Sequence, residues 1–270
     1  MKNIRLSLTL TLLSLLLFSQ CRDENDNFVL IPLEQDVNLG RQVSQEIASD
    51  PETYPILNET AYPEAYDYLE GIINPILNSG EVTYRDEFAW EFYIIEDDET
   101  LNAFATPGGY IYVYTGLIKF LENEDDLAGV IGHEIAHSDL RHSIRNLQRQ
   151  YGLQILLSVA LGEEAGTLAE IAGQITGTLA GLRFSREFEA EADDRSVDYL
   201  AQTAYNCAGA RTFFEQLIEQ GQTAGVPEFL STHPDPANRV DDISAKAREI
   251  GCDTTPFAPD SYEQFKNMLP

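Results

Sequence analysis

The chain has 270 residues, of which 43% are hydrophobic, and this is enough apolar content for a globular domain with a buried core. Its 45 acidic and 17 basic residues give a formal net charge of −28 at pH 7, which argues against nucleic acid as a partner because phosphate backbones are repelled. The acidic residues are spread along the chain and indicate a solvated surface.

Residues 1–20 have the pattern of an export signal. Lys2 and Arg5 precede an apolar run from Leu6 to Phe18, which is too short to span a bilayer comfortably. The run ends at Cys21, and a cysteine in this position resembles a bacterial lipoprotein signal. The alternative is an ordinary secretory signal in which Cys21 has no special role. We expect removal of residues 1–20, a lipid on Cys21, and anchoring to the outer membrane of a Gram-negative bacterium, facing the periplasm or the outside.

Two helices and then two strands are predicted in the first half of the chain. Apolar residues recur at helical spacing over residues 36–49 and 63–77. Phe88–Ile95 and Tyr110–Tyr114 are rich in aromatic and β-branched residues, and a turn signal at Thr106–Gly109 separates them. We expect these strands to form a small antiparallel sheet in a predominantly helical α+β fold.

A His-Glu-x-x-His motif occupies residues 133–137. Asn123 with Asp126 is typical of a helix start, so both histidines are expected on one helix. Helical residues four apart point within about 40° of each other, so His133 and His137 converge as two ligands of a tetrahedral zinc. Glu134 is rotated by about 100° and can act as general base on a metal-activated water. The alternative is two core histidines with Glu134 facing solvent.

The residues that follow His137 are assigned no chemistry. His142 lies five positions further on, an offset that points it away from the metal, and we expect a surface histidine near the helix end. Arg141, Arg145 and Arg149 recur every four residues, which is typical of a solvated helix face.

A second helical stretch supplies carboxylates about fifty residues downstream. In and just before the segment from Ser185 to Asp193, Phe184, Phe188 and Ala192 share one helix face, while Glu189 and Asp193 share another. One carboxylate can therefore bind zinc while the other braces a ligand histidine from the second coordination shell.

Two cysteines remain if Cys21 carries a lipid. In an oxidising compartment, Cys207 and Cys252 suggest a disulfide; the alternative is two unpaired, buried thiols.

These motifs together resemble the gluzincin metallopeptidases of the HtpX and CAAX-prenyl-protease type, and among them the exported, BepA-like bacterial members. Asn102–Tyr110, followed by Thr115–Leu117, is similar to that family's strand-turn-strand beside the active site. Thr232–Pro234 followed by Arg239 is similar to its C-terminal motif. The resemblance implies a zincin-like fold with one Zn²⁺ per chain and Glu189 as the third ligand. Glu187 and Glu191 are the neighbours from which this ligand has to be distinguished.

The resemblance also implies a role for His233, as an oxyanion donor or as a fourth zinc ligand; the alternative is a turn histidine before Pro234. The segment Tyr151–Leu182 occupies the place of membrane spans in HtpX-type members, but three glutamates interrupt it. A buried helical hairpin or a cover over the cleft is expected instead.

The domain organisation follows from these assignments. We expect a flexible tether at residues 21–35, a metallopeptidase domain at 36–255 and a C-terminal tail at 256–270. The helical-repeat domain by which some BepA-like members engage outer-membrane assembly machinery is not expected.

The predicted function is zinc-dependent endopeptidase activity on unfolded or misfolded envelope proteins, with Glu134 as general base and His233 as a second catalytic candidate. An extended polypeptide substrate is expected to pair with an exposed edge of the Tyr110–Tyr114 strand. The alternatives are a catalytically silent, zinc-binding chaperone or interaction module, and a zinc-stabilised structural protein closed by a fourth ligand. The sequence carries no signal for an oligomeric state.

Overall fold

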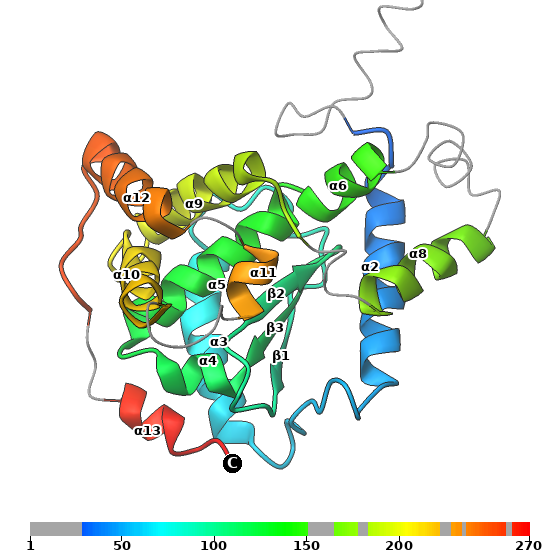
Figure 1. Ribbon diagram of the computed structural model, residues 1–270, viewed down its shortest axis with the longest axis horizontal. Helices are drawn as coiled ribbons and strands as arrows, with labels where there is room; N and C mark the ends of the chain where they lie inside the picture. The colour runs from blue at the N-terminus through cyan, green and yellow to red at the C-terminus, as the bar shows by residue number, and fades with distance from the viewer. Residues whose placement is uncertain (1–28, 151–164, 178–182, 222–227, 234–235, 258–260) are drawn as a thin grey trace, which may run out of the picture.

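The computed structural model describes residues 29–150, 165–177, 183–221, 228–233, 236–257 and 261–270. A small sheet lies at its centre, with helices on both faces, so the predicted α+β, predominantly helical fold is confirmed (Figure 1). The predicted export signal and Cys21 lie outside the described residues. The described elements are α2 (Leu33–Ala48), α3 (Pro63–Leu77), β1 (Glu91–Ile95), β2 (Ala103–Thr106), β3 (Tyr110–Tyr114), α4 (Thr115–Phe120), α5 (Glu124–Asp139), α6 (His142–Gln150), α8 (Ala165–Gly177), α9 (Arg186–Leu200), α10 (Gly209–Gly221), α11 (Glu228–Thr232), α12 (Pro236–Ile250) and α13 (Tyr262–Lys266).

The sheet is mixed, with strand order β1-β3-β2, and the predicted antiparallel pairing of the first and last strands is wrong. β1 runs parallel to β3, in register from Glu91 opposite Tyr110 to Ile95 opposite Tyr114. The antiparallel partner of β3 is β2, because the two are joined by only three residues, of which Gly108 and Gly109 have φ of 76° and 86°. β1 therefore takes the other side of β3.

The two faces of the sheet pack against different helices. Ala103, Ala105 and Ile111 face the larger core, which is formed with α3, α5, α9 and α10. Phe104 and Tyr112 face the opposite side and pack with Leu39, Val43 and Ile47 of α2. α8 lies against α2 on the outside of this second layer (Figure 1). The sheet thus separates α5 from α2.

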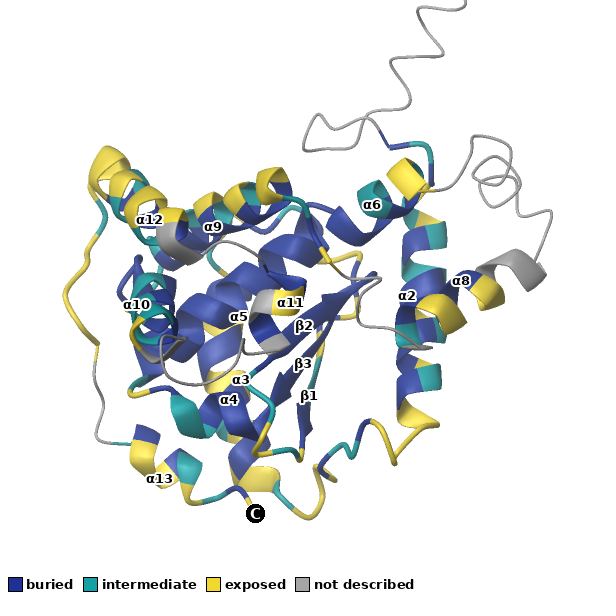
Figure 2. Cartoon of the chain, viewed as in Figure 1, coloured by how far each residue is buried: buried dark blue, intermediate teal, exposed yellow. Residues whose placement is uncertain are grey.

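All sixteen residues of α5 are buried, and the helix lies at the centre of the molecule (Figure 2). Its start is as predicted: the Asn123 side chain accepts a hydrogen bond from the Asp126 backbone N–H at 3.0 Å. Gly129 allows α10 to approach, since a Cβ at this position would lie 2.0 Å from the Ala210 backbone nitrogen. Helices on several sides therefore hold α5 in place.

The helix does not continue into α6. Arg141 stands between the two with φ 55°, which ends the i to i+4 pattern and turns the chain. Its guanidinium is buried, with Nε 2.8 Å from Asp36 Oδ2 and Nη2 2.7 Å from the Ile31 carbonyl oxygen. The prediction that Arg141 belongs to a solvated face is wrong, because the turn directs its side chain toward α2.

Arg145 and Arg149 point the other way, toward α9. Arg145 forms an ion pair with Glu191 at 2.6 Å, and only 11% of its side chain is exposed. Arg149 pairs with Glu187 at 2.9 Å and is half exposed. Of the three arginines predicted to be solvated, only Arg149 has substantial exposure.

Both ends of the described chain pack on the domain. Val29 and Ile31, within the range predicted as a tether, are buried. Tyr262 and Phe265 of α13, within the predicted tail, belong to the larger core. Cys207 and Cys252 form a disulfide that joins the segment before α10 to the end of α12.

The segment Tyr151–Leu182 is described only at residues 165–177, which form α8. Tyr54 donates a hydrogen bond to the Thr176 carbonyl oxygen at 2.8 Å, and Thr176 donates to Glu46 at 2.8 Å. The remainder of the predicted hairpin or cover lies outside the described residues. Within the described ranges, no helix is long and apolar enough to cross a bilayer.

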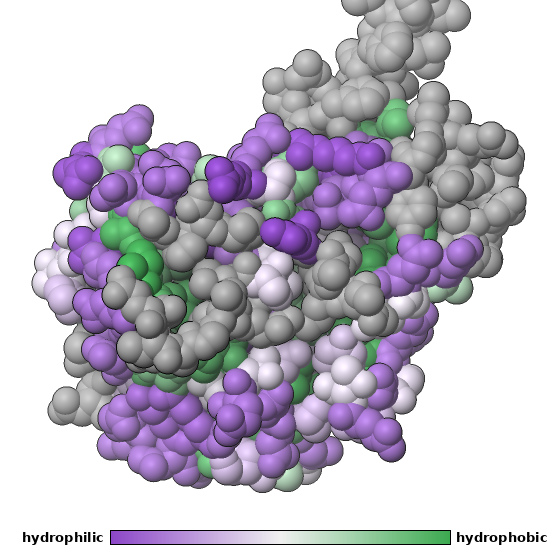
Figure 3. All heavy atoms as spheres, in the orientation of Figure 1, coloured by the Kyte–Doolittle hydropathy of each residue, from purple (hydrophilic) through white to green (hydrophobic). Residues whose placement is uncertain are grey.

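The surface shown in Figure 3 is largely hydrophilic, as the net charge of −28 leads one to expect. Among the described residues, Ile250 and Phe257 are the large hydrophobic side chains with substantial exposure, at 41% and 38%. They lie on either side of the disulfide cysteine Cys252.

The contact between α5 and α10 can be tested with a matched pair of substitutions. Gly129→Ala should lower the free energy of unfolding by about 1–3 kcal/mol, because the new methyl group collides with the α10 backbone. Gly71→Ala, at an exposed position of α3 with no atom near the new methyl group, should raise it by about 0.5–1 kcal/mol. Urea unfolding measures both, and equal effects of the two variants would contradict this account of α5.

Candidate metal centre

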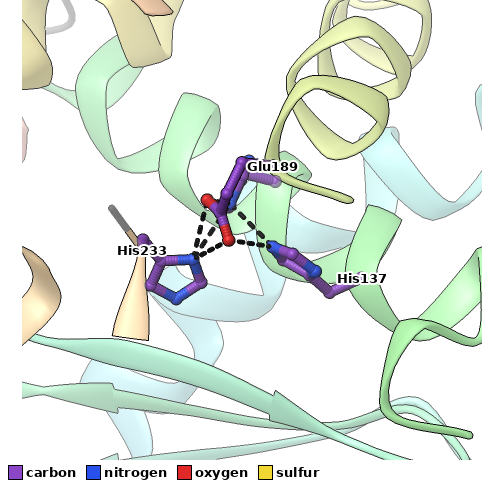
Figure 4. Close-up of side chains that lie close together, drawn as sticks. His137, Glu189 and His233 are labelled. Carbon is purple, nitrogen blue, oxygen red and sulfur yellow. Dashed lines mark hydrogen bonds and ion pairs between the residues drawn. The ribbon is translucent and has the colours of Figure 1, made fainter. Parts of the chain in front are cut away.

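Four buried side chains bring possible metal ligands together. His133 and His137 come from α5, Glu189 comes from the first turns of α9, and His233 directly follows α11. Each of the four is 1% exposed, and one donor atom from each lies within 4.8 Å of all the others. Figure 4 shows His137, Glu189 and His233 pointing toward one another above the strands.

The donor atoms converge on one point. His133 Nε2 and His137 Nε2 are 2.9 Å apart, and His233 Nδ1 lies 3.3 Å from His133 Nε2. Glu189 Oε2 is 3.4 Å from His133 Nε2, and Glu189 Oε1 is 3.6 Å from His137 Nε2. Imidazole nitrogens and a carboxylate oxygen at such separations are a donor set that suits zinc.

The start of α9 places Glu189. Ser185 caps the helix, its Oγ accepting a hydrogen bond from the Phe188 backbone N–H at 3.3 Å. Further along α9, Ser196 Oγ donates to the Gly129 carbonyl oxygen at 3.1 Å. A Cβ at Gly132 would lie 2.7 Å from the same Ser196 Oγ, so small residues let α9 lie close to α5.

His233 is positioned by contacts with Phe229, a residue of α11. Its backbone N–H donates to the Phe229 carbonyl oxygen at 2.8 Å, and its ring stacks on Phe229 with centroids 4.4 Å apart. The Phe229 backbone N–H donates in turn to the Leu101 carbonyl oxygen at 3.1 Å, just before β2. α11 therefore lies between the metal centre and the start of β2.

Glu134 is fully buried, and neither of its carboxylate oxygens has a hydrogen-bond partner among the described residues. The His233 ring lies beside it, with Nε2 3.4 Å from Glu134 Oε1. Burial raises the pKa of Glu134, although the neighbouring His233 and His133 act to lower it. A buried carboxylate that makes no hydrogen bond to the described residues, beside the four donors, fits a centre that also takes a metal ion and a reactive water.

Asp193 and Arg239 support His133. Asp193 Oδ1 lies 2.9 Å from His133 Nδ1, the ring nitrogen that faces away from the donor cluster. Arg239 holds the same carboxylate with two hydrogen bonds of 2.6 and 2.7 Å, and its Nη1 lies 2.9 Å from Glu189 Oε2. The sequence resemblance singled out Arg239 as part of a motif, but these contacts had no signal in the sequence.

His142 supports His137, and the prediction of a surface histidine is wrong. His142 is fully buried, with Nδ1 2.8 Å from His137 Nδ1. The prediction assumed a regular helix, whereas the turn at Arg141 brings His142 back against His137.

The charges around the centre set the pKa values of its groups. Burial and Arg239 lower the pKa of His133, but the carboxylates of Asp193 and Glu189 outweigh them and raise it to about 9. Burial and the neighbouring His133 hold the pKa of His137 well below its usual value. Burial raises the pKa of Glu189, but His233 and Arg239 outweigh it, and the net shift is strongly downward. Glu189 is therefore ionised and available as an anionic donor.

The two glutamates next to this donor along α9 lie elsewhere. Glu187 is exposed and pairs with Arg149 at 2.9 Å. Glu191 interacts with His142 at 3.2 Å and with Arg145 at 2.6 Å. Burial raises the pKa of Glu191, but hydrogen bonds from His142 and Arg145 lower it to about 2. Of these three glutamates, only Glu189 joins the donor set.

Comparisons with known proteins agree with this site. Residues 63–247 match the model of peptidase family M48. The chain is 32% identical over 174 residues to the mitochondrial metalloendopeptidase OMA1 of Schizosaccharomyces pombe, which covers 64% of this chain and 50% of that protein. It is 32% identical over 186 residues to the β-barrel assembly-enhancing protease of Escherichia coli strain K12, covering 65% of this chain and 37% of that protein.

The protein of the same name from Yersinia pestis is 30% identical over 232 residues, which covers 82% of this chain and 45% of that protein. The chain thus spans half or less of the length of these curated relatives. The family match includes the whole of α5 and α9, and with them His133, Glu134, His137 and Glu189. The chain therefore belongs to peptidase family M48.

Proposed function

We propose that the protein is a zinc-dependent endopeptidase that cleaves unfolded or misfolded proteins of the cell envelope. The observation that carries this proposal is Glu134, a buried carboxylate with no hydrogen-bond partner among the described residues, beside four converging metal donors. Membership of a peptidase family and the metalloendopeptidase name of one relative support the same reaction.

His133, His137 and Glu189 would hold the zinc ion, the two histidines through Nε2. When bound, zinc supplies Lewis acidity, which acidifies a water and polarises the scissile carbonyl group. Asp193 would keep His133 in the required tautomer by accepting a hydrogen bond from its Nδ1–H, with the two atoms 2.9 Å apart. Arg239 would hold Asp193 in place through its two hydrogen bonds.

Glu134 would act as the general base and then as the general acid. Its carboxylate would take a proton from the attacking water and return it to the amine of the leaving product. Burial raises its pKa, and this makes the carboxylate a better proton acceptor than an exposed glutamate.

His233 has two possible roles, and the geometry favours that of a fourth ligand in the state described here. Its Nδ1 faces Glu189 at 3.2 Å from both oxygens, while its Nε2 faces Glu134. In this position it would engage the base and occupy the place of the water, so the enzyme would be inactive until His233 withdraws. An oxyanion donor would instead point at the substrate carbonyl group.

A four-donor site is also what a zinc-stabilised structural protein or a silent binding module would have. Glu134 argues against both alternatives. A fully buried carboxylate that makes no hydrogen bond to the described residues costs stability and serves no purpose in a purely structural site. It has a purpose if the fourth position opens to water and substrate.

The predicted substrate-binding edge must be revised. β3, the Tyr110–Tyr114 strand, is the central strand, with β1 on one side and β2 on the other, so it offers no free edge. β2 is the edge strand beside α5, and Ser138 Oγ donates to the Thr106 carbonyl oxygen at 2.8 Å to hold the two together. We propose that an extended peptide pairs with β2 once α11 has moved. Main-chain pairing favours unfolded segments over folded ones.

The envelope location rests on the export signal and on Cys21 as an acylation site. The name of the β-barrel assembly-enhancing protease points to the same compartment. The proposed partners are therefore extended polypeptides and, through the lipid, a membrane.

Glu134→Gln should lower the rate of casein cleavage by a factor of about 10²–10⁴ or more, because the amide cannot accept the proton. Its zinc content should stay at one ion per chain. Glu187→Gln, at an exposed position two residues from Glu189, should leave both quantities unchanged. Equal cleavage by wild type and Glu134→Gln would refute the mechanism.

Glu189→Ala should lose zinc, because it removes the anionic donor from the set. Glu187→Ala should retain it, because that side chain faces solvent. Metal analysis of both purified variants after dialysis measures the difference. Zinc loss in Glu187→Ala with retention in Glu189→Ala would reverse the assignment of the third ligand.

Lipidation of Cys21 can be measured with a palmitate analogue in cells that express the full chain. Wild type should incorporate the label and remain with the membrane fraction. Cys21→Ala should do neither, while Cys252→Ala should still be labelled. Labelling of Cys21→Ala at the wild-type level would show that the signal is an ordinary secretory one.

A further inference from the structure

A chain of contacts leads outward from His137 through a residue that the proposed mechanism does not use. His142 Nδ1 lies 2.8 Å from His137 Nδ1, and His142 Nε2 lies 3.2 Å from Glu191 Oε2. Arg145 also holds Glu191, with Nη1 2.6 Å from Oε2 and Nη2 3.2 Å from Oε1. His137 and His142 are both buried.

We infer that His142 is a positioning residue that orients His137 for metal binding. The inference rests on the proposed function in one respect, namely that His137 binds the metal through Nε2. The structure supports this choice of atom, because Nε2 faces the donor cluster while Nδ1 faces His142.

If His137 binds the metal through Nε2, the positions of the protons on the His137 and His142 rings are determined. A neutral imidazole that binds a metal through Nε2 carries its proton on Nδ1, so His137 must donate from Nδ1. The atom at 2.8 Å, His142 Nδ1, must therefore be the acceptor. His142 then carries its own proton on Nε2, and this N–H donates a hydrogen bond to Glu191.

Ring stacking holds the two histidines in the required planes. The His142 ring stacks on Phe188 with centroids 4.4 Å apart and 10° between the planes. The His137 ring stacks on Phe184 at 4.0 Å and 16°. The start of α9 supplies three of these groups within four residues. Phe188 stacks on His142, Glu189 is the third metal donor, and Glu191 accepts the hydrogen bond from His142.

The turn at Arg141 is what brings His142 into reach. In a regular helix, a residue five positions after His137 would point about 140° away from it. With φ 55° at Arg141, the chain turns and His142 begins α6 facing His137. The ion pair between Arg141 and Asp36 of α2 anchors this turn.

The two metal-binding histidines of α5 are thus supported in parallel ways. His133 donates to Asp193, which Arg239 holds. His137 donates to His142, which contacts Glu191, and Arg145 holds Glu191. Each chain of contacts ends in an arginine. Loss of such an outer partner lowers metal affinity by about 10- to 100-fold in other metalloproteins.

Two substitutions of His142 separate hydrogen bonding from packing. His142→Phe keeps an aromatic ring against Phe188 but removes the acceptor. His142→Asn restores an acceptor oxygen close to the position of Nδ1. Zinc affinity is measured on the purified mature chain by competition with a chromophoric chelator, and the unfolding free energy of the metal-free protein is measured in urea. Glu187→Gln is the control.

We expect His142→Phe to lower zinc affinity by about 10- to 100-fold and His142→Asn to recover most of the loss. The metal-free stability of both variants should stay close to that of the control. If His142→Phe binds zinc as wild type does, or if Phe and Asn lose affinity equally, the inference is overturned. Glu191→Leu, at a partly exposed position, should cause a smaller loss and provides a second test if His142→Phe does not fold.

Glu189→Ala in the same assay separates this inference from the proposed function. If Glu189→Ala loses zinc while His142→Phe keeps it, only the role of His142 is wrong. If Glu189→Ala binds zinc as wild type does, the proposed metal site is wrong, and the role of His142 is wrong with it.

Discussion

The complete burial of α5 is the constraint on which the rest of the structure depends. A helix with all of its residues buried has no solvent for its polar side chains, and α5 carries four acidic residues besides its two histidines and Glu134. Each polar group therefore needs a partner from another element.

Asp139 accepts hydrogen bonds from the backbone N–H groups of Thr83 and Tyr84 and from the Tyr199 hydroxyl. Asp125 accepts from the backbone N–H groups of Asn206 and Phe257 in the same way. These contacts hold loops and α9 around the helix. Glu134 differs, because neither of its carboxylate oxygens has a hydrogen-bond partner among the described residues.

The sequence predicts those features that depend on spacing within a regular helix. His133 and His137 converge because they are four residues apart, and the Asn123 cap marks where their helix begins. Glu189 and Asp193 share a face for the same reason, and the structure brings both to His133. The resemblance to a known family was needed to choose Glu189 over its neighbours, since Glu187 and Glu191 have the same chemistry and differ only in what packs against them.

The features that the sequence does not predict depend on a single irregular residue or on contacts between distant segments. Arg141 adopts a positive φ, which a non-glycine residue seldom does, and no motif announces it. That one turn buries Arg141 against Asp36 and moves His142 from the predicted surface to the metal centre. The parallel pairing of β1 was not predicted because residue composition indicated Phe88–Ile95 as the antiparallel partner of Tyr110–Tyr114, whereas β2, a four-residue strand, occupies that side of β3.

The donor set divides into a fixed part and a weakly held part. His133, His137 and Glu189 lie on helices of fifteen or sixteen residues, and an outer chain of contacts braces each histidine. His233 instead follows a five-residue helix, too short to be stable by itself, and Phe229 is its main contact apart from the centre. Withdrawal of the His233 side chain would require the loss of its stacking contact with Phe229, which is held in the core by Phe213 and Phe214, whereas the other donors lie on core helices. If substrate displaces one of the four donors, we expect it to displace His233. The three donors that remain, His133, His137 and Glu189, are the ligands that a zinc peptidase needs.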